Sequence, residues 1–220
     1  MHIPDLHPWE VTPRQAAAIQ QDLRGKVIRE DRFRRIHSVA GVDVGYSEDG
    51  KTTRAGVVVL NYPHLEGIDQ ATALMPVSFP YIPGLLSFRE IPVILGALEK
   101  LTSLPDLLVC DGHGYAHPRR FGLACHLGLL TGLPSIGVAK SILVGEHAPL
   151  ASERGSQSQL IEAGEVIGLA LRTRQEVRPV YVSTGHRISL ETAAGFILNC
   201  SPKYRLPEPL RLAHHLASGD

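Results

Sequence analysis

The spacing of short apolar stretches constrains the fold of this chain more than any other feature of its sequence. Residues 39–44 and the β-branched run at 56–60 flank a turn at 47–51, which is the pattern of a β-hairpin. A weaker third strand is expected between residues 67 and 77, and the proline-bracketed stretch 79–84 should form a stiff loop. The sheet is therefore predicted to begin with three antiparallel strands.

After residue 84 the pattern changes, and apolar strands alternate with helical segments. A helix at 93–101, a strand at 106–111, a helix at 121–130 and a strand at 134–138 follow one another as in βα units, which predicts parallel strands. Further strands are expected at 166–171 and 180–183, with helices near 190–199 and 208–216. Residues 145–164 are polar and poor in strand signals. We predict an α/β protein with helices flanking a mixed sheet.

The N-terminal region begins without a strand or helix pattern. A helix is expected at 14–24, because the Thr12 hydroxyl can cap its start and Pro13 suits its first position. We expect residues 1–12 to be a flexible N-terminal extension. The 220 residues contain no obvious linker, which favours a single domain spanning residues 1–220.

The composition argues against several classes of protein. The formal net charge is zero, so no overall field draws the chain to nucleic acid or to an anionic membrane, and nucleic-acid contacts must come from local basic patches. Cys110, Cys125 and Cys200 form no CxxC pair, which argues against a disulfide framework and a cysteine zinc site and favours a cytoplasmic location. No stretch approaches the roughly 20 apolar residues of a membrane span.

Two of the predicted strands end in an aspartate followed by a turn-prone glycine. Asp43 precedes Gly45 near the end of one strand, and Asp111 precedes Gly112 at the end of another. Either aspartate alone is better explained as a turn or helix cap, but the repeated arrangement favours a functional pair at the strand ends of an α/β sheet. Two such carboxylates suit Mg²⁺, which prefers oxygen ligands and keeps several waters.

Glu90 has two explanations. Ser87 and Glu90 have the spacing of a capping box, in which the glutamate returns to the amide of the N-cap residue. Pro92 argues against this, because a helix capped at Ser87 needs an amide donor there, and a helix start near Ile91 accommodates the proline better. Glu90 would then lie at the helix entrance, free to serve as a ligand.

Longer motifs make the sequence similar to a known family. They run in order along nearly the whole chain, and only the first dozen residues and 145–164 lie outside them. The motifs include Pro80-Tyr81-Ile82-Pro83-Gly84, Ser87-Phe88-Arg89-Glu90, Asp111-Gly112-His113-Gly114, His117-Pro118-Arg119-Arg120-Phe121-Gly122, Ile136-Gly137-Val138-Ala139-Lys140 and Arg211-Leu212-Ala213-His214. In these the chain resembles the endonuclease V family, the deoxyinosine 3′ endonucleases.

The resemblance implies an RNase H-like fold, with three antiparallel strands followed by parallel ones. It implies a monomeric hydrolase that nicks inosine-containing DNA, or RNA, in the repair of deaminated bases. Cleavage would occur at the second phosphodiester bond 3′ to the lesion and leave a 3′-hydroxyl and a 5′-phosphate. Asp43 and Asp111 would bind Mg²⁺, for which Mn²⁺ should substitute, and Glu90 would support the ion. His214, favoured over His215 by the motif, would position or deprotonate the attacking water.

Two side chains are expected to act directly on the substrate. Lys140 follows an apolar strand and can place its ammonium on a phosphate oxygen or on the leaving group; a lysine at a helix start is the alternative. Tyr81, held between prolines beside Ile82 and Pro83, is the predicted wedge that stacks on a base step as the lesion is expelled.

Backbone and basic groups complete the predicted substrate site. Amides and carbonyls near Gly84, Gly112 and Gly137 are expected to select hypoxanthine, which presents a carbonyl at C6 and a hydrogen on N1. His117 is assigned to substrate binding, and Arg119 with Arg120 and residues 183–186 to phosphate contacts, for which ordinary surface polarity is the alternative. The glycines and proline around His113 and His117 argue against a zinc helix.

Two other functions are compatible with these residues. An RNase H-like nuclease without inosine specificity would share the acids but need no wedge. A nucleic-acid-binding module that lost its chemistry would not need the full set of Asp43, Glu90, Asp111, Lys140 and His214. The choice between DNA and RNA is left open, because no residue identifies a 2′-hydroxyl contact.

Overall fold

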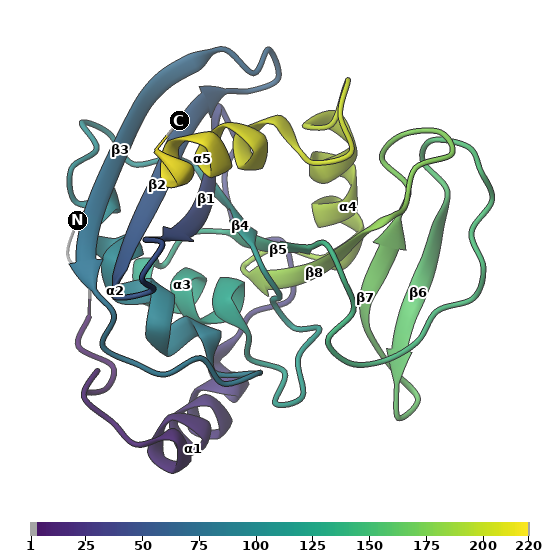
Figure 1. The fold of residues 1–220 in the computed structure, drawn as a ribbon. Coiled ribbons are helices and arrows are strands. Elements are labelled where there is room, and N and C mark those ends of the chain that lie inside the picture. Colours follow the sequence, from purple (N-terminus) through teal and green to yellow (C-terminus); the bar gives the residue numbers. More distant parts are fainter. Residues whose placement is uncertain (1–3, 220) are drawn as a thin grey trace.

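An eight-stranded mixed sheet forms the centre of the computed structural model, which describes residues 4–219 (Figure 1). Its strand order is β3-β2-β1-β4-β5-β8-β7-β6. The first three strands in sequence are antiparallel, β4 and β5 run parallel to β1, and β8, β7 and β6 are again antiparallel. The expected antiparallel and parallel parts are confirmed. The strands are β1 Ser38–Tyr46, β2 Thr52–Asn61, β3 Gly67–Pro76, β4 Leu107–Asp111, β5 Ser135–Ala139, β6 Gln157–Glu162, β7 Glu165–Leu171 and β8 Val180–His186.

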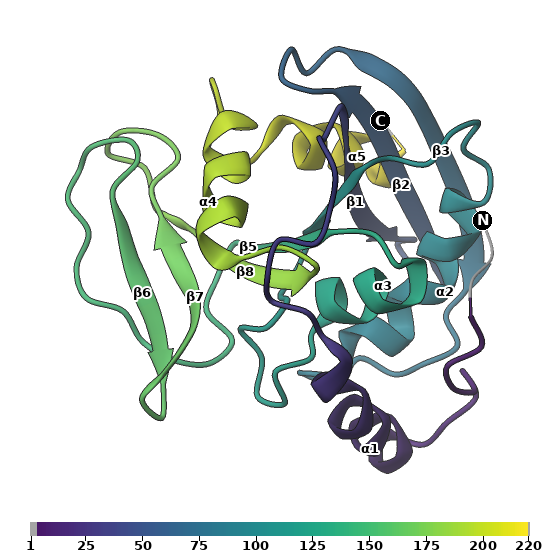
Figure 2. The same ribbon diagram turned by 180° about the vertical axis from the view of Figure 1, so that it is seen from behind.

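Helices cover both faces of the sheet (Figures 1 and 2). Alternate residues of one strand enter different cores: Val39 packs with residues of α4 and α5, whereas Ala40 packs with residues of α2 and α3. No helix among residues 4–219 is long and apolar enough to cross a membrane. The helices are α1 Pro13–Leu23, the short 3₁₀ helix η1 Arg24–Lys26, α2 Leu86–Leu98, α3 Leu123–Thr131, α4 Leu190–Asn199 and α5 Glu208–Ser218.

Glycines let α5 lie directly on the backbone of β1 and β2. A Cβ added to Gly41 would lie 1.9 Å from the Pro209 carbonyl oxygen, and one added to Gly56 would lie 2.5 Å from the Ala213 carbonyl oxygen. Any larger side chain would push the helix away from the sheet. This close packing fixes the height of α5 above the end of β1, where the site described below is formed.

The start of α2 differs from the expectation. The helix begins at Leu86 and not near Ile91, it contains Pro92, and Leu85 is its N-cap without a side-chain hydrogen bond. The capping box at Ser87 is therefore wrong as well. Burial explains the result: Phe88 and Ile91 are 1% and 0% exposed, and packing of this apolar face offsets the single helical hydrogen bond that the proline removes.

The segment at 145–164 contains a strand that the sequence pattern did not predict. β6 is an edge strand in which only Leu160 is fully buried, so its side chains carry little apolar signal. Pairing with β7 forms it: Glu162 pairs with Glu165 across Ala163 and Gly164, whose φ angles are both positive, as in the tight turns favoured by hairpins.

The N-terminal segment also differs from the expected flexible extension of residues 1–12. Residues 1–3 lie outside the described part of the chain, but His7 is 8% exposed and its Nε2 lies 2.7 Å from Nε2 of His126 in α3. The Trp9 ring stacks on the His126 ring, with centroids 5.6 Å apart. Aromatic contacts therefore hold this segment against the helical layer although it has no regular secondary structure. The predicted cap of α1 by Thr12 is confirmed.

Candidate active site

The parallel pairing of β1 and β4 places two carboxylates side by side. Val42 pairs with Cys110, so the next residues, Asp43 and Asp111, leave adjacent strands at the same edge of the sheet. Both side chains are half-buried. Burial raises the pKa of Asp43, and the nearby negative charge of Asp111 raises it further. Two acids that repel each other in this way favour a bound cation.

Each aspartate has a basic partner from another element. His214 of α5 lies over β1, and its Nδ1 is 2.7 Å from Oδ2 of Asp43. Lys140 follows β5 directly and forms an ion pair with Oδ2 of Asp111. The second oxygen of Asp43 accepts a hydrogen bond of 2.8 Å from the amide of Val44. The structure thus brings together four of the five predicted catalytic residues through β1, β4, β5 and α5.

The fifth, Glu90, approaches from α2 and is almost completely buried, with 7% of its surface exposed. Burial raises its pKa to about 8, and the charges of Asp43 and Asp111 act in the same direction. The Tyr46 hydroxyl donates a hydrogen bond of 2.8 Å to Oε1 of Glu90. Sequence reasoning missed Tyr46, and its position three residues after Asp43 gives no signal of this contact.

The donor set fits a hard divalent cation that keeps part of its water shell. Among the described residues, no group of three or more His, Cys, Asp or Glu side chains is placed to hold a metal ion. Mg²⁺ does not need one, because one or two carboxylates with waters and a substrate phosphate usually hold it. Burial raises the pKa of both Asp43 and Glu90, and the negative charge of Asp111 raises both further. A cation at the strand ends would oppose this effect, because positive charge favours the ionised carboxylates.

A cavity of about 450 Å³ opens beside these residues. Eleven predicted site residues line it, and they come from segments far apart in the sequence. They are Asp43, Glu90, Asp111, Lys140 and His214 together with Tyr81, Ile82, Pro83, Gly84, Gly112 and His117. Arg119 and Gly137 do not line it. Gln20, His113 and residues 141–143, which sequence reasoning did not assign to the site, contribute to its walls.

The Gly84 carbonyl oxygen accepts hydrogen bonds from three side chains. Gln20 Nε2, His117 Nε2 and Arg119 Nη2 lie 3.1, 2.9 and 2.7 Å from it. Arg119 Nε also donates to the Gln20 side-chain oxygen, at 2.6 Å. Internal acceptors thus bind two of the three guanidinium nitrogens of Arg119, Nε and Nη2, and its contact with phosphate stays a prediction. Together these side chains hold the 80–84 loop in place.

Two other glycines have different parts in the site than expected. Gly137 is covered: a Cβ added there would lie 2.3 Å from the Gly114 amide nitrogen, so it permits close packing under the 112–114 backbone. Gly112 lines the cavity, but its amide donates to the Val138 carbonyl, at 3.0 Å. Neither this amide nor the Gly84 carbonyl is free to select a base.

The 79–84 loop is fixed at its base and exposed at Tyr81. Phe79 is 4% exposed, and its carbonyl accepts a hydrogen bond of 2.7 Å from Arg89 Nη1. Tyr81, by contrast, is 70% exposed at the rim of the cavity. A rigid loop that carries an exposed ring beside a cavity has the arrangement that a wedge requires.

The other expected phosphate contacts are occupied or buried. Arg120 forms ion pairs with Glu162 and Glu165 of the β6–β7 hairpin. Residues 183, 184 and 186 are at most 4% exposed. Burial lowers the pKa of His113 and of His117 to about 4, so both rings are neutral near pH 7.

Known proteins of one family are similar to this chain in sequence and in structure. A family model described as Endonuclease V matches residues 21–215. A protein of that name from Trichormus variabilis is 54% identical over 219 residues, 99% of either chain. The crystal structure of endonuclease V from Streptomyces avermitilis is similar with a TM-score of 0.92 and 46% identity, covering 99% of this chain and 95% of that one. A Ciona intestinalis endonuclease V, in complex with a 24mer DNA containing an inosine followed by a ribo-adenosine, has a TM-score of 0.81 and 31% identity, covering 94% and 96%.

Proposed function

The chain belongs to the endonuclease V family, and we propose that it nicks inosine-containing strands at the second phosphodiester bond 3′ to the lesion. The products would carry a 3′-hydroxyl and a 5′-phosphate, and the reaction would begin the repair of deaminated bases. The observation that carries the proposal is the joint placement of two strand-end carboxylates, a lysine and a histidine in one cavity beside the Tyr81 loop. A relative of 31% identity is bound to inosine-containing DNA, which supports this substrate class.

Asp43 and Asp111 would bind Mg²⁺, or Mn²⁺ in its place, and Glu90 would support the ion. When bound, the ion neutralises charge on the phosphate and makes water more acidic. Asp43 holds the His214 ring through Nδ1, so Nε2 is the nitrogen available to take a proton from the attacking water. Lys140 lies where its ammonium can balance negative charge that grows on the reacting phosphate.

The loop and the cavity would divide the recognition of the lesion between them. Tyr81 would stack on the bases that remain in the duplex, offsetting part of the cost of expelling the altered base. The expelled base would enter the cavity, whose volume of about 450 Å³ lies in the range of small-molecule sites. Gln20, His117 and Arg119 would act on recognition indirectly, by holding the Gly84 carbonyl.

One experiment tests the proposal against its two alternatives. Matched strands with inosine or adenine at one position, made as DNA and as RNA, are incubated with and without Mg²⁺. We expect cutting only with inosine and Mg²⁺, at the second bond 3′ to the lesion. Equal cutting of the adenine strands would support a nuclease without inosine specificity. Binding without any cutting would support a non-catalytic module. Either result would overturn the proposal.

A further inference from the structure

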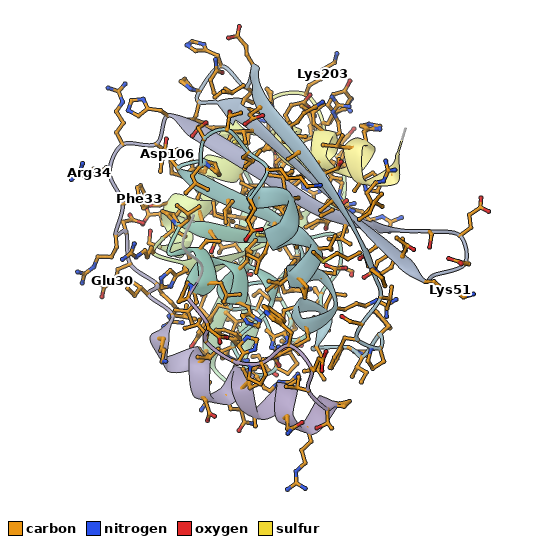
Figure 3. All side chains as sticks on the ribbon, turned by 90° about the vertical axis from the view of Figure 1, so that its left-hand side faces the viewer. Glu30, Phe33, Arg34, Lys51, Asp106 and Lys203 are labelled. Carbon is orange, nitrogen blue, oxygen red and sulfur yellow. The ribbon has the colours of Figure 1, made fainter. Side chains whose placement is uncertain are left out.

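The turn between α4 and α5 presents an aromatic ring among basic side chains. Tyr204 is 39% exposed, and the Arg211 guanidinium carbon lies 4.9 Å from the centre of its ring. The Lys203 ammonium lies 5.5 Å from the same ring centre. Figure 3 labels Lys203 at the outer surface near the yellow ribbon of α5. An exposed ring with cations beside it is the combination with which proteins bind single nucleic-acid strands.

Hydrogen bonds hold this turn rigidly. The Arg205 guanidinium donates to the carbonyls of Arg178 and Pro179, both at 2.9 Å. The Thr173 hydroxyl donates to the carbonyl of Arg205, at 2.6 Å. Tyr204 is therefore held on a backbone that is ordered before any ligand arrives, which reduces the entropy lost on binding.

One hydrogen bond and the helix α5 connect the turn to the active site. Arg205 Nη2 also donates to the carbonyl of Lys140, at 3.0 Å, and the Lys140 ammonium pairs with Asp111. Arg211 stands one helical turn before His214 on α5. The turn that carries Tyr204 is thus joined to Lys140 by the Arg205 hydrogen bond and to His214 through α5. In Figure 1 the turn before α5 lies in the upper part of the view, and the β3–α2 connection, which carries Tyr81, runs through the lower part.

The charge around the turn favours a polyanion. Lys203 and Arg178 are exposed, and neither forms an ion pair within residues 4–219. Arg211 is bound by Glu208, which fixes its guanidinium against the Tyr204 ring. In a chain of zero net charge, this local excess of positive charge is the kind of patch that contacts phosphates.

We propose that Tyr204, supported by Arg211 and Lys203, is a stacking platform for a base of the substrate strand beyond the scissile phosphate. The proposal rests on the function proposed above, because cleavage 3′ to the lesion requires the strand to continue past Lys140 and His214. A base that stacks on the exposed side of the ring displaces the Lys203 ammonium, which then contacts a neighbouring phosphate. The platform binds nucleotides 3′ of the scissile bond.

The test compares binding of strands that differ only in their length 3′ of the scissile position. Fluorescence anisotropy in metal-free buffer measures the affinity of the wild-type protein, Tyr204→Ala and Tyr204→Phe for inosine strands and unmodified strands. We expect Tyr204→Ala to weaken binding of the long strands about tenfold, the effect of losing one stacked base. It should leave the affinity for strands truncated just past the scissile bond unchanged. Tyr204→Phe keeps the ring and should bind like the wild type.

The outcomes separate this proposal from the proposed function. Equal affinity of Tyr204→Ala and the wild type for long strands overturns the platform. A loss that disappears only on 5′ truncation, or that is the same for every strand length, overturns it too. Because the assay requires neither cleavage nor inosine, a protein that fails to nick inosine strands but shows the length-dependent loss refutes the proposed function and retains the platform.

Discussion

Replacing Glu90 by glutamine should stabilise the metal-free protein at alkaline pH while removing a group that supports catalysis. The side chain is 7% exposed, and burial raises its pKa from 4.5 to about 8. A carboxyl whose pKa is higher in the folded than in the unfolded protein stabilises the fold below pH 4.5. That stability is lost as the pH rises through about 8. Glutamine has nearly the same shape, can still accept the Tyr46 hydrogen bond and carries no charge to desolvate.

The size of the effect follows from the two pKa values. The difference between 4.5 and about 8 corresponds, at about 1.4 kcal/mol per pH unit, to a loss on the order of 5 kcal/mol. Most of this loss falls between pH 5 and pH 8. The neutral buried rings of His113 and His117 contribute stability in the opposite direction as the pH rises, because burial lowers their pKa values to about 4. Those contributions are common to both proteins and cancel in the comparison.

Urea unfolding of both proteins at pH 5 and pH 8, without divalent ions, measures the prediction. Glu90→Gln should gain stability relative to the wild type as the pH rises, and saturating Mg²⁺ at pH 8 should stabilise the wild type more than the variant. The matched control is Glu99→Gln, an exposed position at the end of the same helix, which should show neither effect. If the wild type and Glu90→Gln change stability in parallel between pH 5 and pH 8, Glu90 ionises normally and the reasoning is refuted.

Three further predictions concern the aspartates, the wedge and the loop support. Asp43→Ala and Asp111→Ala should each abolish nicking but leave the circular dichroism spectrum unchanged, because two repelling carboxylates contribute little stability without their ion. Retained nicking in either variant would contradict the assignment of that aspartate to metal binding. Tyr81→Ala should weaken binding of inosine strands about tenfold. The melting temperature of the protein should not change, since the ring is 70% exposed. An unaltered affinity for inosine strands would contradict the wedge role. Gln20→Leu should lower the free energy of unfolding by about 2–3 kcal/mol, because it leaves the Phe121 carbonyl and Arg119 Nε without their partner. The control Gln21→Leu, on the exposed side of α1, should have little effect. Equal denaturation midpoints for these last two variants would show that the buried hydrogen bonds are dispensable.

Local sequence was sufficient to predict the elements that are marked by the periodicity of their apolar residues. The hairpin of β1 and β2 and the βα alternation through β5 follow from β-branched runs, turn residues and helical spacing. The strand ends carrying Asp43 and Asp111 could be located for the same reason, and β1 and β4, as neighbouring parallel strands, place their carboxyl ends at one edge of the sheet. Residues 79–84 could be identified as a stiff loop from their prolines alone.

Elements and contacts that depend on residues far apart in the sequence could not be predicted from local sequence. β6 carries few buried side chains and forms because β7 pairs with it. The start of α2 is set by burial of Ile91 against the sheet and of Phe88 against α1 and the N-terminal segment, which outweighs the local effect of Pro92. In both cases the free energy that decides the conformation comes from tertiary interactions. Intrinsic preference alone predicts no strand at β6 and a later start for α2.

The sequence by itself determined which chemical groups this site contains: two strand-end aspartates, a glutamate, a lysine, a histidine and an aromatic loop, in the order typical of one family. Only the tertiary structure decided what each group contacts. It placed Arg119 on the Gly84 carbonyl, and it buried Glu90 beside Tyr46. The physical reason is that the charge state and hydrogen-bond partner of a side chain depend on burial and on groups brought close by folding, and neither is encoded in its sequence neighbours.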